Sequence, residues 1–240
     1  MSQIVDVLFP MMNLSPFVNV CKVVALVVLL SVFFTLEGQA QEQDFQIWGD
    51  VSVKYKINKK LKLSSELGMR TRENSRLLKQ NYMEIGGRYK IIKLISIGAK
   101  YRYTNYFLDS KTSVHRMNMD VYLQKKWGRT HWALRERFQH QWFVSDYKNK
   151  VNVQSLRSRI QLSYNIRKTK LEPYFAVEHY LGLNGSSLWL TQRLRWTLGL
   201  EFPLNKWSDI AAAYRIQREY YQANPLTSYV FLLSYKISLK

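Results

Sequence analysis

Pairs of basic residues separated by one residue recur along the sequence, as RTR at 70–72, KYR at 100–102, RER at 135–137, RSR at 157–159 and RLR at 193–195. On an extended strand, residues two apart point to the same face. Each pair would therefore place two cationic side chains side by side. Guanidinium groups bind carboxylates and phosphates through parallel hydrogen bonds, so the pattern is typical of an ion-pair network or of an anion-binding surface.

Catalysis on lipid would need a nucleophile and a base within reach of each other, and a His-x-Ser pair on one strand face meets that need. The residues two positions after His115, His131, His140 and His179 are Met117, Ala133, Trp142 and Leu181. We therefore expect no enzyme, with a triad assembled from several strands as the alternative. The sequence also lacks a cluster of metal ligands, an acidic calcium loop and a glycine-rich phosphate loop, so we predict neither a metal nor a cofactor.

Apolar and polar residues alternate along nearly the whole chain from Phe45 onward, which is the pattern of two-faced β-strands. In the last segment, Tyr229, Phe231, Leu233, Tyr235, Ile237 and Leu239 are apolar or aromatic, and Ser234, Lys236, Ser238 and Lys240 lie between them. Short turn signals such as NKK at 58–60 and PLNK at 203–206 separate such segments. We count about eleven strands of roughly ten to fourteen residues, which is long compared with an average strand.

Strand length and the two-faced pattern predict an all-β fold, an antiparallel transmembrane β-barrel with short turns on one side and slightly longer loops on the other. Inside a bilayer every backbone polar group must pair within a closed sheet. Trp127 and Trp132 flank the turn GRT at 128–130 and Trp207 follows PLNK, as in the aromatic girdles of membrane barrels. Because bacterial single-chain barrels have even strand numbers, we expect the count of eleven to be off by one and predict about 10–12 strands.

An apolar run at Val23–Leu36 follows Lys22 and precedes Gly38 and Ala40, which have the small-x-small spacing of a signal-peptidase site. We predict that the chain has a signal peptide followed by one barrel domain, with a membrane anchor as the alternative to the signal peptide. The predicted bounds are 1–40 for the signal peptide and 41–240 for the barrel.

Cysteine content and charge agree with export. The only cysteine, Cys21, would leave with the signal peptide, so the exported chain would have no disulfide. The net charge of +19, from 36 basic and 17 acidic residues, would by itself suggest nucleic acid as a partner. Export removes most of that case, and we expect no nucleic acid.

The polar face of the strands is predicted to line the lumen of the barrel. These candidate lumen residues are Arg70, Arg72, Arg88, Lys100, Arg102, Arg135, Arg137, Arg157, Arg159, Arg193, Arg195, Arg215, Glu66, Glu84, Glu178 and Glu201. One interpretation is a structural network of Arg and Glu side chains that fills a narrow barrel. The other is a row of unpaired arginines that attracts anions. Both can hold at different depths.

Three stretches, DVSVKYKINKKLKLSSELGMRTRE at 50–73, YMEIGGRYKIIKLISIGAKYRY at 82–103 and RSRIQLSYNIRKTKLEPYFAVE at 157–178, resemble a known family. The chain is similar, from Phe45 to Leu239, to the exported proteins grouped as domain of unknown function 2490. The resemblance implies an outer-membrane-type barrel without an established activity, and it implies no site residues.

We expect an outer-membrane protein of a Gram-negative bacterium, either a narrow, anion-preferring pore or transporter or a structural component of the membrane. The expected partners are outer-membrane lipid, the barrel-assembly machinery and a small anionic solute. A lipid-modifying enzyme of the same membrane is the first alternative. A soluble periplasmic barrel that binds an apolar ligand is the second.

Overall fold

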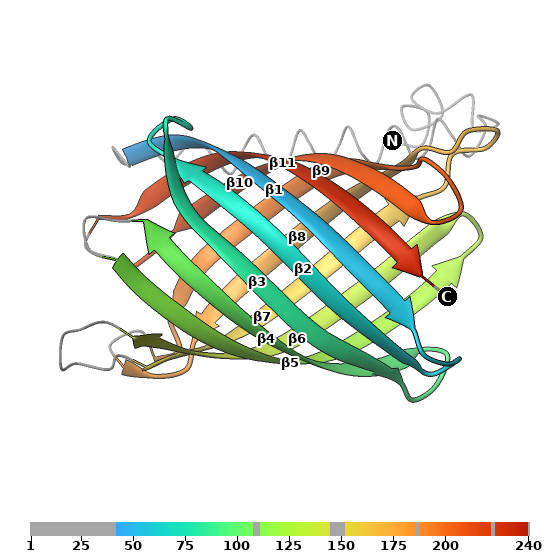
Figure 1. Cartoon of the computed structure of the whole chain (residues 1–240), viewed down its shortest axis with the longest axis horizontal. Helices are drawn as coiled ribbons and strands as arrows, with labels where there is room; N and C mark the ends of the chain where they lie inside the picture. The colour runs from blue at the N-terminus through green and yellow to red at the C-terminus, as the bar shows by residue number, and fades with distance from the viewer. Residues whose placement is uncertain (1–41, 108–110, 145–151, 186–187, 222–223, 240) are drawn as a thin grey trace, which may run out of the picture. The chain divides into compact units, whose positions relative to one another are not determined.

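The computed structural model describes residues 42–107, 111–144, 152–185, 188–221 and 224–239. The predicted signal peptide, residues 1–40, lies outside the described residues. Within the described ranges, eleven strands form one closed barrel, which Figure 1 shows with β1 in blue and β11 in red. No helix in these ranges is long and apolar enough to cross a bilayer.

The strands follow one another around the barrel in chain order. They are β1 (Glu42–Lys56), β2 (Leu61–Arg72), β3 (Leu77–Lys90), β4 (Ile95–Phe107), β5 (Lys111–Trp127), β6 (Thr130–Val144), β7 (Asn152–Tyr164), β8 (Glu172–Gly182), β9 (Thr191–Pro203), β10 (Ser208–Glu219) and β11 (Leu226–Leu239). Consecutive strands pair antiparallel. The closing pair, β1 with β11, is parallel.

Tight connections join the strands at one end of the barrel, called the turn end. Asn58 organises the first connection, because its Oδ1 accepts hydrogen bonds from the backbone N–H groups of Lys60 and Leu61, both at 2.8 Å. Asn205 does the same between β9 and β10, accepting from Trp207 at 2.7 Å and from Ser208 at 2.9 Å. Asparagine favours such turns because its side chain can replace a backbone acceptor. The opposite end of the barrel, where β1 begins, is called the loop end.

The two faces of the sheet have opposite chemistry. Large apolar side chains on the outer face are exposed, for example Leu67 at 58% and Met119 at 62%. Acidic side chains on the inner face are buried, for example Glu84 at 3% and Asp120 at 2%. The alternation in the sequence thus becomes an apolar exterior and a charged interior, the reverse of a soluble barrel with an apolar ligand cavity.

The predicted all-β barrel of 10–12 strands is confirmed, with eleven strands among the described residues. The expectation that eleven was off by one is wrong. An odd number closes because the first and last strands run in the same direction and still exchange backbone hydrogen bonds. The strand β1 consequently starts at the loop end and finishes beside the end of β11, at the turn end.

The parallel closure can be tested with a cysteine pair. Ile47 and Phe231 are direct partners across the β1–β11 seam, and neighbouring strands about 4.8 Å apart meet the geometry of a disulfide. In a Cys21→Ser background, we expect Ile47→Cys with Phe231→Cys to form a disulfide that changes migration in non-reducing gels. The control, Ile47→Cys with Leu232→Cys, places the thiols on opposite faces and should not cross-link. An uncross-linked 47/231 pair would contradict the seam.

Candidate functional site

A cavity of about 700 Å³ lies inside the barrel and is called the lumen here. Its lining extends from Tyr220 and Tyr221 near the loop end to Glu201 and Lys236 near the turn end. Thirteen of the lining residues are basic and six are acidic. The lumen therefore carries a clear excess of positive charge among the described residues.

Most of the candidate lumen residues line this cavity. They are Glu66, Arg70, Glu84, Lys100, Arg102, Arg135, Arg137, Arg157, Arg159, Glu178, Arg193, Arg195, Glu201 and Arg215. Arg72 and Arg88 are not part of the lining. Arg72 pairs with Glu73 at 2.8 Å where β2 ends at the loop end, and Arg88 donates to Gln124 at 3.0 Å near the turn end. Both share the polar face but lie too close to the barrel ends.

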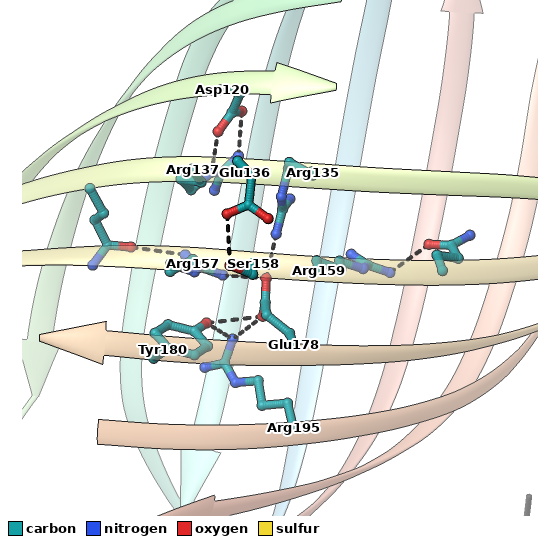
Figure 2. A network of polar contacts seen from close by, with 12 residues as sticks. Asp120, Arg135, Glu136, Arg137, Arg157, Ser158, Arg159, Glu178, Tyr180 and Arg195 are labelled. Atoms are coloured by element: carbon teal, nitrogen blue, oxygen red, sulfur yellow. Dashed lines mark hydrogen bonds and ion pairs between the residues drawn. The ribbon is translucent and has the colours of Figure 1, made fainter. Parts of the chain in front are cut away.

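Glu178 on β8 is the centre of the largest ion-pair cluster, which Figure 2 shows. Its carboxylate accepts hydrogen bonds from Arg135, from Arg157 at 3.0 Å and from Arg195 at 3.1 Å. The Tyr180 hydroxyl donates to it at 3.1 Å. Three guanidinium groups thus share one buried carboxylate, so the cluster stays positively charged.

Glu84 and Glu66 hold a second cluster on β2, β3 and β4. Glu84 accepts from Lys100 at 2.6 Å and from Arg102 at 2.8 Å. Glu66 accepts from the Tyr82 hydroxyl at 2.9 Å and pairs with Arg102 at 3.3 Å. The cluster connects three adjacent strands and supports the structural interpretation of the charged interior.

Asp120 and Arg137 form a bidentate pair between β5 and β6, with hydrogen bonds of 2.5 and 2.7 Å. The Tyr122 hydroxyl donates to the same carboxylate at 2.6 Å. Both charged side chains are almost fully buried. This pair occupies the interior beside β5. Among the described residues, Arg116 is the only residue of β5 that lines the lumen.

Four lumen arginines have no carboxylate partner among the described residues. Arg116 donates to Gln141 at 3.0 Å, Arg159 to Gln161 at 2.7 Å and Arg215 to Thr197 at 3.0 Å. Arg70 stacks on aromatic rings instead. None of the four forms a direct ion pair, although Arg70 interacts electrostatically with Asp50 and Arg215 with Glu178. The lumen therefore contains both ion-paired arginines and arginines held by neutral partners.

Three aromatic rings intercalate between the guanidinium groups. Trp48 has Arg70 at 3.9 Å, Arg215 at 5.3 Å and Arg195 at 5.5 Å from its ring centre. Tyr82 has Arg102 at 3.8 Å, and Tyr180 has Arg157 at 4.3 Å. Such contacts attract cations to the ring face.

Sequence reasoning missed these rings and Arg116 as lumen groups. Trp48, Tyr82 and Tyr180 each occupy a position of the polar face, so an aromatic residue in the polar alternation was the available signal. Arg116 shares a face with Asn118 and Asp120 at spacings of two residues. That spacing was sufficient to find it.

A row of polar side chains crosses β6, β7 and β8 on the otherwise apolar outer face. Glu136, Ser158 and His179 lie directly opposite one another on β6, β7 and β8. The Ser158 hydroxyl donates to Glu136 at 2.7 Å (Figure 2), and the Nε2 atom of His179 is 3.0 Å from the Thr191 hydroxyl. An acid, a hydroxyl and an imidazole thus share one face of adjacent strands.

The other histidines are not part of that row. His115 stacks on Trp142 with ring centres 5.5 Å apart, and His140 contacts the same indole at 5.5 Å. His131 lies at the start of β6, at the turn end. Across the described ranges, no three His, Cys, Asp or Glu side chains are grouped so that they could hold a metal ion.

The Glu178 cluster predicts a large loss of stability when its carboxylate is neutralised. Glu178→Gln would leave three guanidinium groups without their shared counter-ion, and we expect it to lower the free energy of unfolding by about 3 kcal/mol. The control is Glu201→Gln, because Glu201 is 34% exposed and pairs with Lys236 alone, so about 1 kcal/mol or less should be lost. Urea unfolding in detergent micelles measures both. Equal losses would contradict the central role of Glu178.

Two solved structures of autotransporter domains are among those similar to this chain. The β domain of the Bordetella autotransporter BrkA is similar at 9% identity and a TM-score of 0.46, over 73% of this chain and 83% of that chain. The translocator domain of the autotransporter NalP from Neisseria meningitidis is similar at 14% identity and a TM-score of 0.37, over 71% of each chain. At these values the likeness carries no functional information. No curated protein matches the sequence.

A family model described as Protein of unknown function (DUF2490) matches residues 45–227. The match covers most of the barrel and includes the stretches that carried the resemblance in the sequence. The chain therefore belongs to the DUF2490 family.

Proposed function

We propose that this protein is an outer-membrane β-barrel of a Gram-negative bacterium and that its lumen is a narrow, anion-preferring pore. One observation carries the proposal, namely an apolar exterior that surrounds a cavity lined mainly by basic side chains. In this proposal, lipid covers the outer face, the barrel-assembly machinery inserts the exported chain, and a small anion is the solute.

The exterior favours a membrane because of its extent. Exposed apolar side chains such as Ile85, Val121, Ile160 and Leu200 occur on strands around the barrel. Soluble monomers rarely expose continuous apolar patches of more than a few hundred Å². Each Å² that lipid covers contributes about 25 cal/mol, so a bilayer stabilises this surface and water does not.

The lumen favours anions because its positive charges exceed its negative charges. A low-dielectric wall around an aqueous path strengthens the potential inside it. Barrels of about eight strands are filled by side chains, and barrels of sixteen or more strands enclose wide channels. Eleven strands and a lumen of about 700 Å³ therefore support a narrow path and small solutes.

The pore is tested by conductance in planar bilayers under a salt gradient. We expect the wild-type barrel to prefer anions, and Arg157→Gln with Arg159→Gln to lower that preference because both side chains line the lumen. The control, Lys125→Gln with Lys126→Gln, removes the same charge from exposed residues near the turn end and should leave the reversal potential unchanged. Absence of conductance, or equal selectivity in both variants, would contradict the pore as proposed.

A second candidate function is ester hydrolysis of membrane lipid, because Glu136, Ser158 and His179 form the cross-strand row described above. In this hypothesis the Ser158 oxygen attacks the ester carbonyl and passes its proton to His179. The alcohol leaves with that proton, and water then releases the fatty acid. The pore is preferred because Ser158 bonds to Glu136 and His179 to Thr191, so the Ser–His hydrogen bond of a triad is absent.

The enzyme hypothesis predicts release of fatty acid from phospholipid vesicles by the purified barrel. Ser158→Ala should abolish that release, because it removes the nucleophile. The control, Ser155→Ala, changes a serine of the inner face on the same strand and should retain activity. If the wild-type protein releases no fatty acid, the hypothesis is wrong.

A further inference from the structure

Trp48 is at the centre of a group of cations halfway along β1. The guanidinium carbon of Arg70 lies 3.9 Å from the centre of its ring, and those of Arg215 and Arg195 lie 5.3 and 5.5 Å from it. These arginines belong to β2, β10 and β9, so one indole collects cations from three other strands. Because both guanidinium carbons lie within 5.3 Å of the same ring centre, Arg70 and Arg215 are near neighbours in the lumen.

Hydrogen bonds fix the orientation of this indole. The Trp48 Nε1–H donates to Gln46 at 2.8 Å, and the Gln46 amide donates to Asp44 at 2.7 Å. Gln46 is almost fully buried. The ring is thus held in place, and an arginine that stacks on it presents the N–H groups at the edge of its own plane to the lumen.

Arg70 is the cation whose donors have no protein partner. It lines the lumen, and no described residue hydrogen-bonds or ion-pairs with it. Its only contacts of this kind are the aromatic rings of Trp48 and of Tyr82, the latter at 5.3 Å. A planar guanidinium with free donors in a cavity is suited to bind an oxyanion through two parallel hydrogen bonds.

Nearby carboxylates are already engaged. Glu66 pairs with Arg102, and Glu178 is shared by three arginines that include Arg195. Arg215 donates to the neutral Thr197 hydroxyl. Asp50 also lines the lumen and interacts electrostatically with Arg70, but it accepts its hydrogen bond from Ser234 at 2.8 Å and forms no ion pair in the described ranges. Arg70 and Arg215 therefore lie beside the same indole without a directly bound carboxylate among the described residues.

We propose that Arg70, Arg215 and Trp48 form a binding site for a small divalent oxyanion such as phosphate or sulfate. Two guanidinium groups without a directly bound carboxylate suit a divalent anion, and the N–H groups of each can donate to separate oxygens of one tetrahedral anion. The indole keeps two like charges close together by attracting both to its faces. The inference rests on the proposed pore, of which this site would be the selective point, and it predicts that anion flux saturates.

Sulfate is the probe, and isothermal titration calorimetry on the detergent-purified barrel is the measurement. We expect saturable sulfate binding at constant ionic strength and none with chloride. Arg70→Gln should weaken sulfate binding by about tenfold or more, because charge-assisted hydrogen bonds are lost. Arg215→Gln should weaken it as well, so the proposal does not depend on one variant that could fail to fold.

Arg88→Gln is the matched control. Arg88 also stacks on an aromatic ring, Tyr122 at 3.8 Å, and has no carboxylate partner among the described residues, but it does not line the lumen. Its substitution should leave sulfate binding unchanged. The site is refuted if sulfate shows no saturable binding, or if Arg70→Gln and Arg88→Gln behave alike.

The binding result and the conductance result separate the two proposals. Sulfate binding without conductance would remove the pore and keep the anion site. Anion-selective conductance without sulfate binding would remove the site and keep the pore.

Discussion

Closure of the sheet is the constraint on which the rest of this structure depends. An unpaired backbone N–H or C=O group in hydrocarbon costs several kcal/mol, so in the proposed membrane the first strand has to pair with the last. Fourteen residue pairs join β1 to β11. The side chains of Gln46 and Ser228, 182 residues apart in the chain, hydrogen-bond across this seam. Because such distant contacts complete the barrel, its edges are protected only when almost the whole chain has folded.

Closure also decides where the charges go. With alternate side chains on the apolar outer face, the others must fill the interior, and this sequence fills it with more cations than carboxylates. Buried guanidinium groups need hydrogen-bond acceptors or ring faces, and Glu178, Trp48 and Tyr180 provide both. The same side chains therefore brace the barrel and produce its positive interior. In the proposed pore, structural support and anion attraction would be two results of one network rather than competing explanations.

The period of two predicted which residues face inward, because side-chain alternation is a local property of a strand. The alternate residues Tyr229, Phe231, Leu233, Tyr235, Ile237 and Leu239 could be assigned to the outer face from the sequence alone. The count of eleven strands was also available from the sequence, but the parallel seam that permits an odd number was not, because it depends on how the first and last strands meet. The partners of the buried ion pairs could not be predicted from the sequence either. Arg135 and Glu178 lie on strands separated by β7, and long side chains that cross a strand are not specified by spacing. Arg72 and Arg88 share the predicted face, but alternation does not give the depth at which the cavity ends.

The parallel seam places the start of the first strand and the end of the last strand at opposite rims of the barrel. Since β1 and β11 point the same way, Glu42 and Leu239 emerge at opposite rims of the cylinder. A sheet with an even strand count would return its chain to the rim from which it started. In the membrane proposed here, epitope tags attached immediately before Glu42 and after Leu239 would be displayed in different compartments. Insertion of this sheet is thus also a translocation of one of its flanks.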